Sequence, residues 1–72
     1  MTDKDIVQAI KWHRENKEIK SQDVAEMLGH IPSKYSKIER GEQVITGLEL
    51  VKIAEYFGMT VEELVRVPSR KR

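Results

Sequence analysis

The segment GHIPSKYSKIERG, residues 29–41, has the side chains best suited to chemistry in this chain. At about 100° per residue in an α-helix, Tyr35 and Ile38 fall on one apolar face. The opposite face is polar and basic: Ser33, Lys37 and Arg40, with Lys34 and Ser36 at its flanks. Such a face suits the DNA major groove, which admits one α-helix and offers acceptors to lysine and arginine. A charged outer face is also what any solvated surface helix shows.

Two opposite charges fall on helical faces that are otherwise apolar. Arg14 shares a face with Val7 and Ile10, and Glu39 lies beside Tyr35 on the apolar face of the 32–40 segment. Since a lone buried charge is costly, we expect Arg14 and Glu39 to form an ion pair joining their helices. The alternative is that each side chain reaches water separately.

Helical signals position these residues and divide the chain into five short segments. Thr2 and Asp5 resemble a capping box at the start of a helix over Asp3–Asn16, and a second helix covers Ser21–Leu28 before Gly29. A third begins with Pro32 in its first turn and ends before Gly41, which suits a left-handed backbone.

The last two helices have matching start signals. Thr46 and Glu49 form a capping box, and Thr60 and Glu63 repeat it. The corresponding hydrophobic staples pair Ile45 with Leu50 and Met59 with Leu64, and the helices end at Gly58 and at Pro68. No strand pattern persists along the chain, so we expect a compact all-α fold of five helices.

Size and composition indicate one small soluble domain. The chain has 72 residues, of which 39% are hydrophobic and 35% charged. It has no run of apolar residues typical of a signal peptide or a membrane span, which favours the cytoplasm. Residues 1–65 hold 9 Lys/Arg and 12 Asp/Glu, a net −3, whereas residues 66–72 add +4. Any anion-binding surface must therefore be local. We expect a domain over residues 1–67 and a basic tail over residues 68–72.

Neither catalysis nor a cofactor is indicated. There are no cysteines, His13 and His30 lack a metal-ligand spacing, and the carboxylates show no acid/base pair. We therefore expect no metal, no cofactor and no catalytic residue. His13 is expected to be structural or on the surface, and His30 is placed to contact a phosphate. Trp12 is expected to be partly exposed, either against the C-terminal segment or on a partner surface.

Residues 6–65 resemble the phage-repressor, or Cro-type, helix-turn-helix family of bacterial DNA-binding regulators. The resemblance is carried by SQDVAEMLG, the turn after it, SKIERG at 36–41, and KIAEYFGMTVEEL near the end. It implies a lambda-repressor-like fold in which the third helix enters the major groove and the second crosses the DNA backbone. It also places a conserved arginine and glutamate at Arg14 and Glu39.

We expect two sets of DNA contacts. The family's base-reading positions fall on Pro32, Ser33 and Lys37, with Ser36 beside them. The residues themselves favour phosphate contacts at Lys20, Ser21, Gln22, His30, Lys34 and Arg40. The chain departs from the family pattern at Lys20 and Ile31, where a polar helix cap is usual, and at Ser21, where the family has a phosphate-binding glutamine. It also departs at Pro32, which has no N–H to donate to a base, and at Glu42 and Gln43, where basic residues are common.

Two functions follow from these observations. The first is a sequence-specific transcriptional regulator of bacterial or phage type, with repression the expected mode, binding double-stranded DNA as a homodimer. The second is a protein-interaction module, such as an antitoxin or an accessory subunit, in which DNA binding is secondary. Lys34, Lys37 and Arg40 favour the first, whereas Glu42, Glu49 and exposed Trp12 favour the second.

Overall fold

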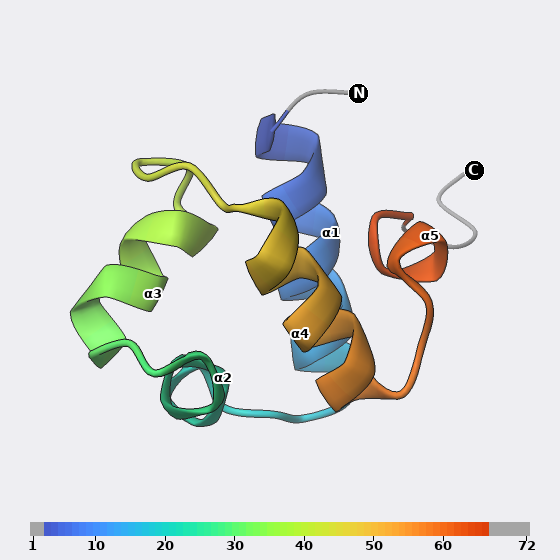
Figure 1. Ribbon diagram of the computed structural model, residues 1–72, viewed down its shortest axis with the longest axis horizontal. Coiled ribbons are helices and arrows are strands. Elements are labelled where there is room, and N and C mark those ends of the chain that lie inside the picture. Colours follow the sequence, from blue (N-terminus) through green and yellow to red (C-terminus); the bar gives the residue numbers. More distant parts are fainter. Residues whose placement is uncertain (1–2, 67–72) are drawn as a thin grey trace.

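The computed structural model describes residues 3–66, which form five α-helices (Figure 1). Their bounds are α1 Asp3–Asn16, α2 Ser21–Leu28, α3 Pro32–Glu39, α4 Gly47–Phe57 and α5 Val61–Leu64. The described residues contain no strand, and the all-α prediction is confirmed. The expected Thr2 cap, the stop at Pro68 and the basic tail at 68–72 lie outside the described residues. None of the helices in residues 3–66 combines the length and the apolar content that crossing a bilayer requires.

Local capping signals explain where α4 and α5 start. Thr46 and Thr60 each cap a helix by accepting a hydrogen bond from the backbone of the glutamate three residues later, Glu49 and Glu63. Each glutamate carboxylate in turn accepts from the backbone N–H of its threonine at 2.9 Å. Both predicted capping boxes are therefore confirmed.

The chain turns left-handed after α1, α2 and α3. Gly29 follows α2 with φ 76°, and the N–H of His30 donates to the carbonyl of Ala25 at 2.8 Å. Gly41 has φ 79° after α3, as its spacing predicted. Glu18, after α1, also has a positive φ of 59°, which is uncommon for a residue with a side chain. The turn after α1 therefore has no glycine to mark it in the sequence, unlike the turns after α2 and α3.

The helices are arranged so that α3 lies at one side of the molecule and α5 at the other (Figure 1). In this view α4 lies in front of α1, and α2 is seen end-on below α3. Helix α2 packs against α3 and α4, and α1 packs against α3 and α5. Helix α3 is consequently held from its inner side by two other helices.

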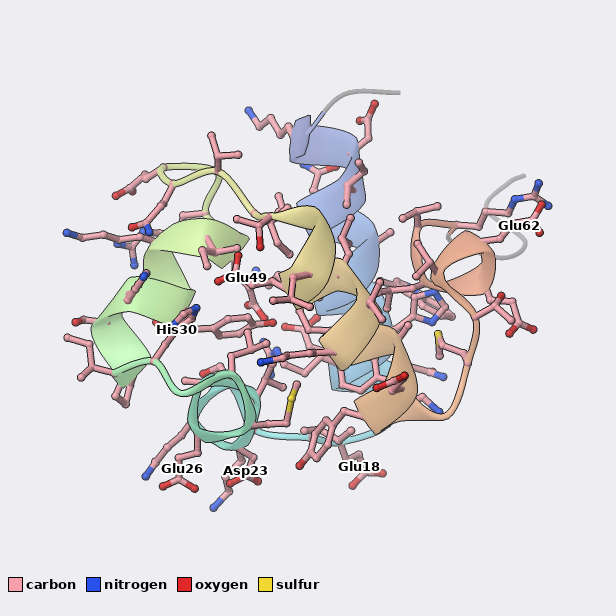
Figure 2. The ribbon with its side chains drawn as sticks, in the orientation of Figure 1. Glu18, Asp23, Glu26, His30, Glu49 and Glu62 are labelled. Carbon is pink, nitrogen blue, oxygen red and sulfur yellow. The ribbon has the colours of Figure 1, made fainter. Side chains whose placement is uncertain are left out.

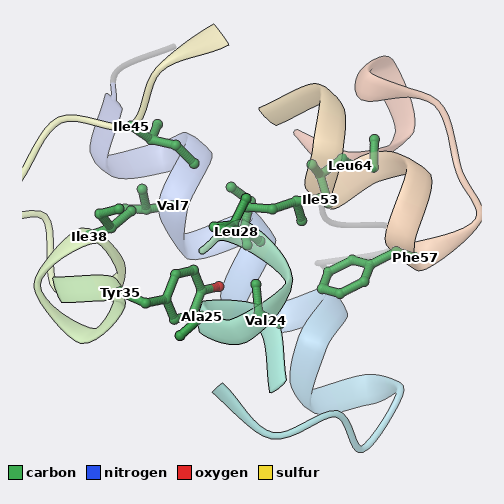
Figure 3. Packing of buried hydrophobic residues seen from close by; sticks show 12 residues of the cluster. Val7, Val24, Ala25, Leu28, Tyr35, Ile38, Ile45, Ile53, Phe57 and Leu64 are labelled. Atoms are coloured by element: carbon green, nitrogen blue, oxygen red, sulfur yellow. The ribbon is translucent and has the colours of Figure 1, made fainter. Parts of the chain in front are cut away.

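One apolar cluster joins all five helices (Figure 3). Its buried members are Val7, Ile10, Val24, Ala25, Leu28, Tyr35, Ile38, Ile45, Ile53, Ala54, Phe57 and Leu64. Tyr35 and Ile38 are the residues that α3 buries, in agreement with the face predicted from its sequence. Burial of apolar side chains is the main term that stabilises a domain of this size, so these two residues fix which face of α3 remains outside.

Candidate nucleic-acid interface

Helices α2 and α3 and the turn between them contain most of the residues expected to contact DNA. The turn spans residues 29–31, and Ile31 is extended with φ −73° and ψ 151°. Pro32 follows as the first residue of α3, where its missing N–H removes no intrahelical hydrogen bond. The extended backbone before the proline sets the angle at which α3 leaves α2.

The outer face of α3 is polar and basic in the structure. Ser33, Lys37 and Arg40 are exposed, and Lys34 and Ser36 at the flanks are half-buried. Pro32 is exposed at the start of the helix. Pro32, Ser33 and Lys37 are thus all exposed, while Ser36 is more covered than the other expected base-reading residues.

The first turn of α2 is the second cluster of expected contacts. Lys20 is the residue before α2, and its side chain makes no capping hydrogen bond. The N–H groups in the first turn of an α-helix have no acceptor within the helix, and they attract anions. Lys20 and Gln22 are exposed and Ser21 is half-buried. An ammonium group and backbone N–H donors therefore adjoin each other here, as a phosphate contact requires.

Arg14 and Glu39 hold α3 against α1. The Nε of Arg14 donates to Oε2 of Glu39 at 2.6 Å, and its Nη2 donates to Oε1 at 3.1 Å. A further donor, Nη1, bonds the carbonyl of Ile19 at 2.8 Å. The two charged side chains are only 12% and 10% exposed. One guanidinium therefore fixes the end of α1, the loop after it and the last turn of α3.

Burial and pairing act in opposite directions on Arg14. Burial works to lower the pKa of Arg14, but the hydrogen bond to Glu39 and the charge of that carboxylate outweigh burial and raise the pKa. The guanidinium is consequently charged at every pH at which the protein is folded.

Two of the expected phosphate-binding residues have acidic partners that the sequence reasoning missed. The Nε of Arg40 donates to Glu42 at 2.9 Å on the exposed end of α3. His30, in the turn, hydrogen-bonds through Nε2 to the carboxylate of Glu49 on α4. A DNA phosphate would have to displace a carboxylate at both positions. The phosphate contacts of Arg40 and His30 therefore stay predictions, with Glu42 and Glu49 as the competing acceptors.

A sequence signal existed for one of these acidic partners but not for the other. Glu42 lies two residues after Arg40, a local spacing that can be read from the chain. His30 and Glu49 are separated by 19 residues, and only the packing of α2 against α4 brings them together.

Two acidic side chains of α2 point away from α3 and α4. Asp23 and Glu26 extend from the side of α2 that faces away from α3 and α4 (Figure 2). Their charges are therefore separated from the basic side chains of α3 by the body of α2.

The remaining residues of interest have structural partners. His13 is buried, and its Nε2 donates to the carbonyl of Arg66 at 2.6 Å, which anchors the chain after α5. Its ring meets Trp12 edge-on, with centroids 5.1 Å apart, and Trp12 is 36% exposed. The described residues contain no cluster of His, Cys, Asp or Glu that would hold a metal ion.

Comparison with protein families agrees with this arrangement. A helix-turn-helix family model of the lambda-repressor and Cro-like class matches residues 10–64, from within α1 to the end of α5. No match was found among curated proteins or among solved structures. The helix-turn-helix match covers more than half of the chain and includes α2, the turn and α3. This protein therefore belongs to the lambda-repressor and Cro-like helix-turn-helix family of DNA-binding domains.

Proposed function

We propose that the protein is a sequence-specific transcriptional regulator that reads the DNA major groove with α3. The observation that carries this proposal is the exposed set Ser33, Lys37 and Arg40, on a helix whose other face is fixed in the core. Side chains on a rigidly held helix can select bases, because their positions are set before the DNA arrives. Repression is the mode we favour, since occupying a site requires nothing beyond this surface.

The proposed phosphate contacts come from both ends of the motif. Lys20, Ser21 and Gln22 would hold one phosphate at the start of α2, and Lys34 and Arg40 would hold others beside the groove. Such contacts fix the register of the protein on DNA but carry no sequence information. His30 can bind a phosphate only if its hydrogen bond to Glu49 breaks.

We further propose that two chains bind inverted half-sites in the cytoplasm of a bacterial or phage-infected cell. One short helix reads only a few base pairs, and a two-fold dimer doubles the length of the site. Exposed apolar side chains on α4 and on the loop before it supply surface for this contact: Val44, Leu48 and Val51.

Base reading and phosphate binding can be separated by two lysines of the same helix. We expect Lys37→Ala to cost about 1 to 3 kcal/mol on the preferred site and to relax the choice of base there. Lys34→Ala, the matched control, should weaken binding to all duplexes alike and lower the salt slope by about one. The measurement is binding of both variants to a selected site and to a scrambled duplex over a salt series.

A protein-interaction module is the competing function, favoured by the exposed Leu48 and Trp12. If neither lysine substitution changes DNA binding, α3 is not the reading element and this competing function becomes the better account. The Lys37→Ala and Lys34→Ala variants distinguish the two functions, provided that their unfolding curves match that of the unchanged protein.

A further inference from the structure

One contact links the turn of the helix-turn-helix to the start of α4. His30 lies between α2 and α3, and its Nε2 hydrogen-bonds Oε2 of Glu49, the third residue of α4. The two side chains point toward one another (Figure 2) and are only 15% and 14% exposed. A contact so well covered is screened far less by solvent than a surface ion pair.

The acceptor in this contact is already fixed by the capping box. The other oxygen of Glu49, Oε1, accepts from the backbone N–H of Thr46 at 2.9 Å, and the N–H of Glu49 donates to the Thr46 hydroxyl at 3.2 Å. One carboxylate therefore both closes the cap of α4 and holds the turn that precedes α3. Burial works to raise the pKa of Glu49, but the hydrogen bonds from Thr46 and His30 outweigh burial and lower it.

We propose that His30 and Glu49 are positioning residues for DNA binding, and that they make it sensitive to pH. In the protonated form, His30 ties the turn before α3 to α4, and the tie weakens when the imidazole loses its proton. The DNA part of this proposal rests on the proposed function, whereas the contact itself does not.

The surroundings of His30 favour Glu49 as its electrostatic partner. The charged residues four positions before and after His30 are Glu26 on α2 and Lys34 on α3. Glu26 points away from the contact (Figure 2), and the α4 residue Lys52 is exposed. An imidazolium that faces the carboxylate of Glu49 adds the attraction of opposite charges to the hydrogen bond, whereas a neutral imidazole N–H lacks that attraction. The tie should therefore be stronger when the imidazole is protonated than when it is neutral.

The alternative role of His30, a direct phosphate contact, makes the opposite prediction for Glu49→Gln. Glutamine still serves in a capping box, so this variant removes the charge that faces His30 and leaves the cap. If His30 binds phosphate, losing its competitor should strengthen DNA binding. If the pair positions the turn, the same substitution should weaken DNA binding.

The first experiment is a double-mutant cycle on unfolding with His30→Gln, Glu49→Gln and the double variant. At about pH 5.5 we expect the two residues to be coupled by about tenfold in the unfolding equilibrium constant. At about pH 8 the coupling should fall to roughly threefold or less, because the neutral imidazole forms the weaker bond. Glu63→Gln is the matched control, since Glu63 closes the same kind of capping box on α5. Coupling that is absent, or equal at both pH values, would overturn the proposal.

The second experiment measures duplex affinity for the same variants across pH and salt. We expect Glu49→Gln to weaken binding about fivefold at about pH 5.5, with the salt slope unchanged and a smaller loss at about pH 8. Tighter binding by this variant, with a lower salt slope for His30→Gln, would instead assign His30 to a phosphate. The affinity of Glu49→Gln for DNA could equal that of the unchanged protein at both pH values while the coupling in the unfolding cycle still depends on pH. The pair would then be structural only, and the positioning role would be wrong. If the unchanged protein binds no duplex, the proposed function itself fails, while the unfolding cycle still reports on the contact.

Discussion

At the scale of single residues, the Arg14–Glu39 pair shows how a charged contact can be required without being a strong net source of stability. Both side chains lost most of their hydration when they were covered, and each is satisfied chiefly by the other. Removing one partner leaves the other charge buried and unpaired. Removing both eliminates that penalty.

We therefore expect Arg14→Ala or Glu39→Ala alone to lower the free energy of unfolding by about 3 to 5 kcal/mol. The double variant Arg14→Met with Glu39→Leu should cost less than the sum of the two single changes, because no charge is stranded. Denaturant unfolding of the three variants measures these differences. Losses under about 1 kcal/mol for both single variants would reduce the pair to a surface contact.

The second residue-scale prediction concerns Tyr35, whose ring is wholly buried and whose hydroxyl has no hydrogen-bond partner among the described residues. Burial, with the nearby Glu39 carboxylate, raises the pKa of this phenol. An unfolded tyrosine ionises near pH 10, so above that pH the unfolded chain releases a proton that the folded chain retains. The stability linked to Tyr35 is thus present below about pH 10 and is lost as the pH rises further.

Tyr35→Phe should change the free energy of unfolding at neutral pH by less than about 1 kcal/mol, since it removes an unsatisfied group. It should also reduce the loss of stability above about pH 10, whereas exposed Tyr56→Phe should leave that loss in place. Unfolding curves collected from neutral to alkaline pH test both statements. Identical alkaline profiles for the unchanged protein and Tyr35→Phe would contradict the assignment.

At the scale of elements, the helices differ in how their first turns are capped. Helices α4 and α5 have complete capping boxes, whereas Lys20 before α2 and Ile31 before α3 provide no side-chain cap. The first N–H groups of α2 are thus left for other acceptors, whereas α3 begins with Pro32, which has no N–H. The missing cap makes the start of α2, where a phosphate is proposed to bind, less stable than a capped helix start.

Lys20→Ser should therefore stabilise the domain by about 1 kcal/mol, because serine caps α2. The same change should weaken DNA binding and lower the salt slope by about one, because a phosphate contact is lost. Thr46→Ala is the opposite control and should destabilise the domain by about 1 kcal/mol through loss of the α4 cap. Paired unfolding and DNA titrations measure both effects. Unchanged DNA affinity in Lys20→Ser would exclude Lys20 from the proposed phosphate contact.

At the scale of the whole molecule, α3 lies at one side and α5 at the other (Figure 1). Under the proposed function, each chain would place one helix in the major groove. We expect two chains on DNA, with half-sites about 34 Å apart or at a multiple of that spacing. Footprinting together with sedimentation of the complex measures the spacing and the stoichiometry. Leu48→Glu should reduce cooperative occupancy of paired half-sites, while leaving the affinity for an isolated half-site nearly unchanged. One chain protecting a single unrepeated half-site would rule out the dimer.

The sequence alone was sufficient for features encoded within a few residues. Helical periodicity predicted which face of α3 is buried, and the Thr-x-x-Glu spacing predicted both capping boxes. The contact between Arg14 and Glu39 spans 25 residues, yet it was expected because each charge lies on an apolar face where solvent cannot satisfy it. The family match then agreed with the motif assigned from residues 21–41.

Tertiary structure decided which polar side chains from distant parts of the sequence meet. His30 and Glu49 each have an ordinary local role, one in a turn and one in a capping box, so neither requires a distant partner. Their contact follows from the packing of α2 against α4. The left-handed turn at Glu18 is similar, since no glycine marks it. Local spacing determines periodicity and capping because these interactions lie within one or two helical turns. The partner of a half-buried polar group is determined only when the core fixes the distances between helices.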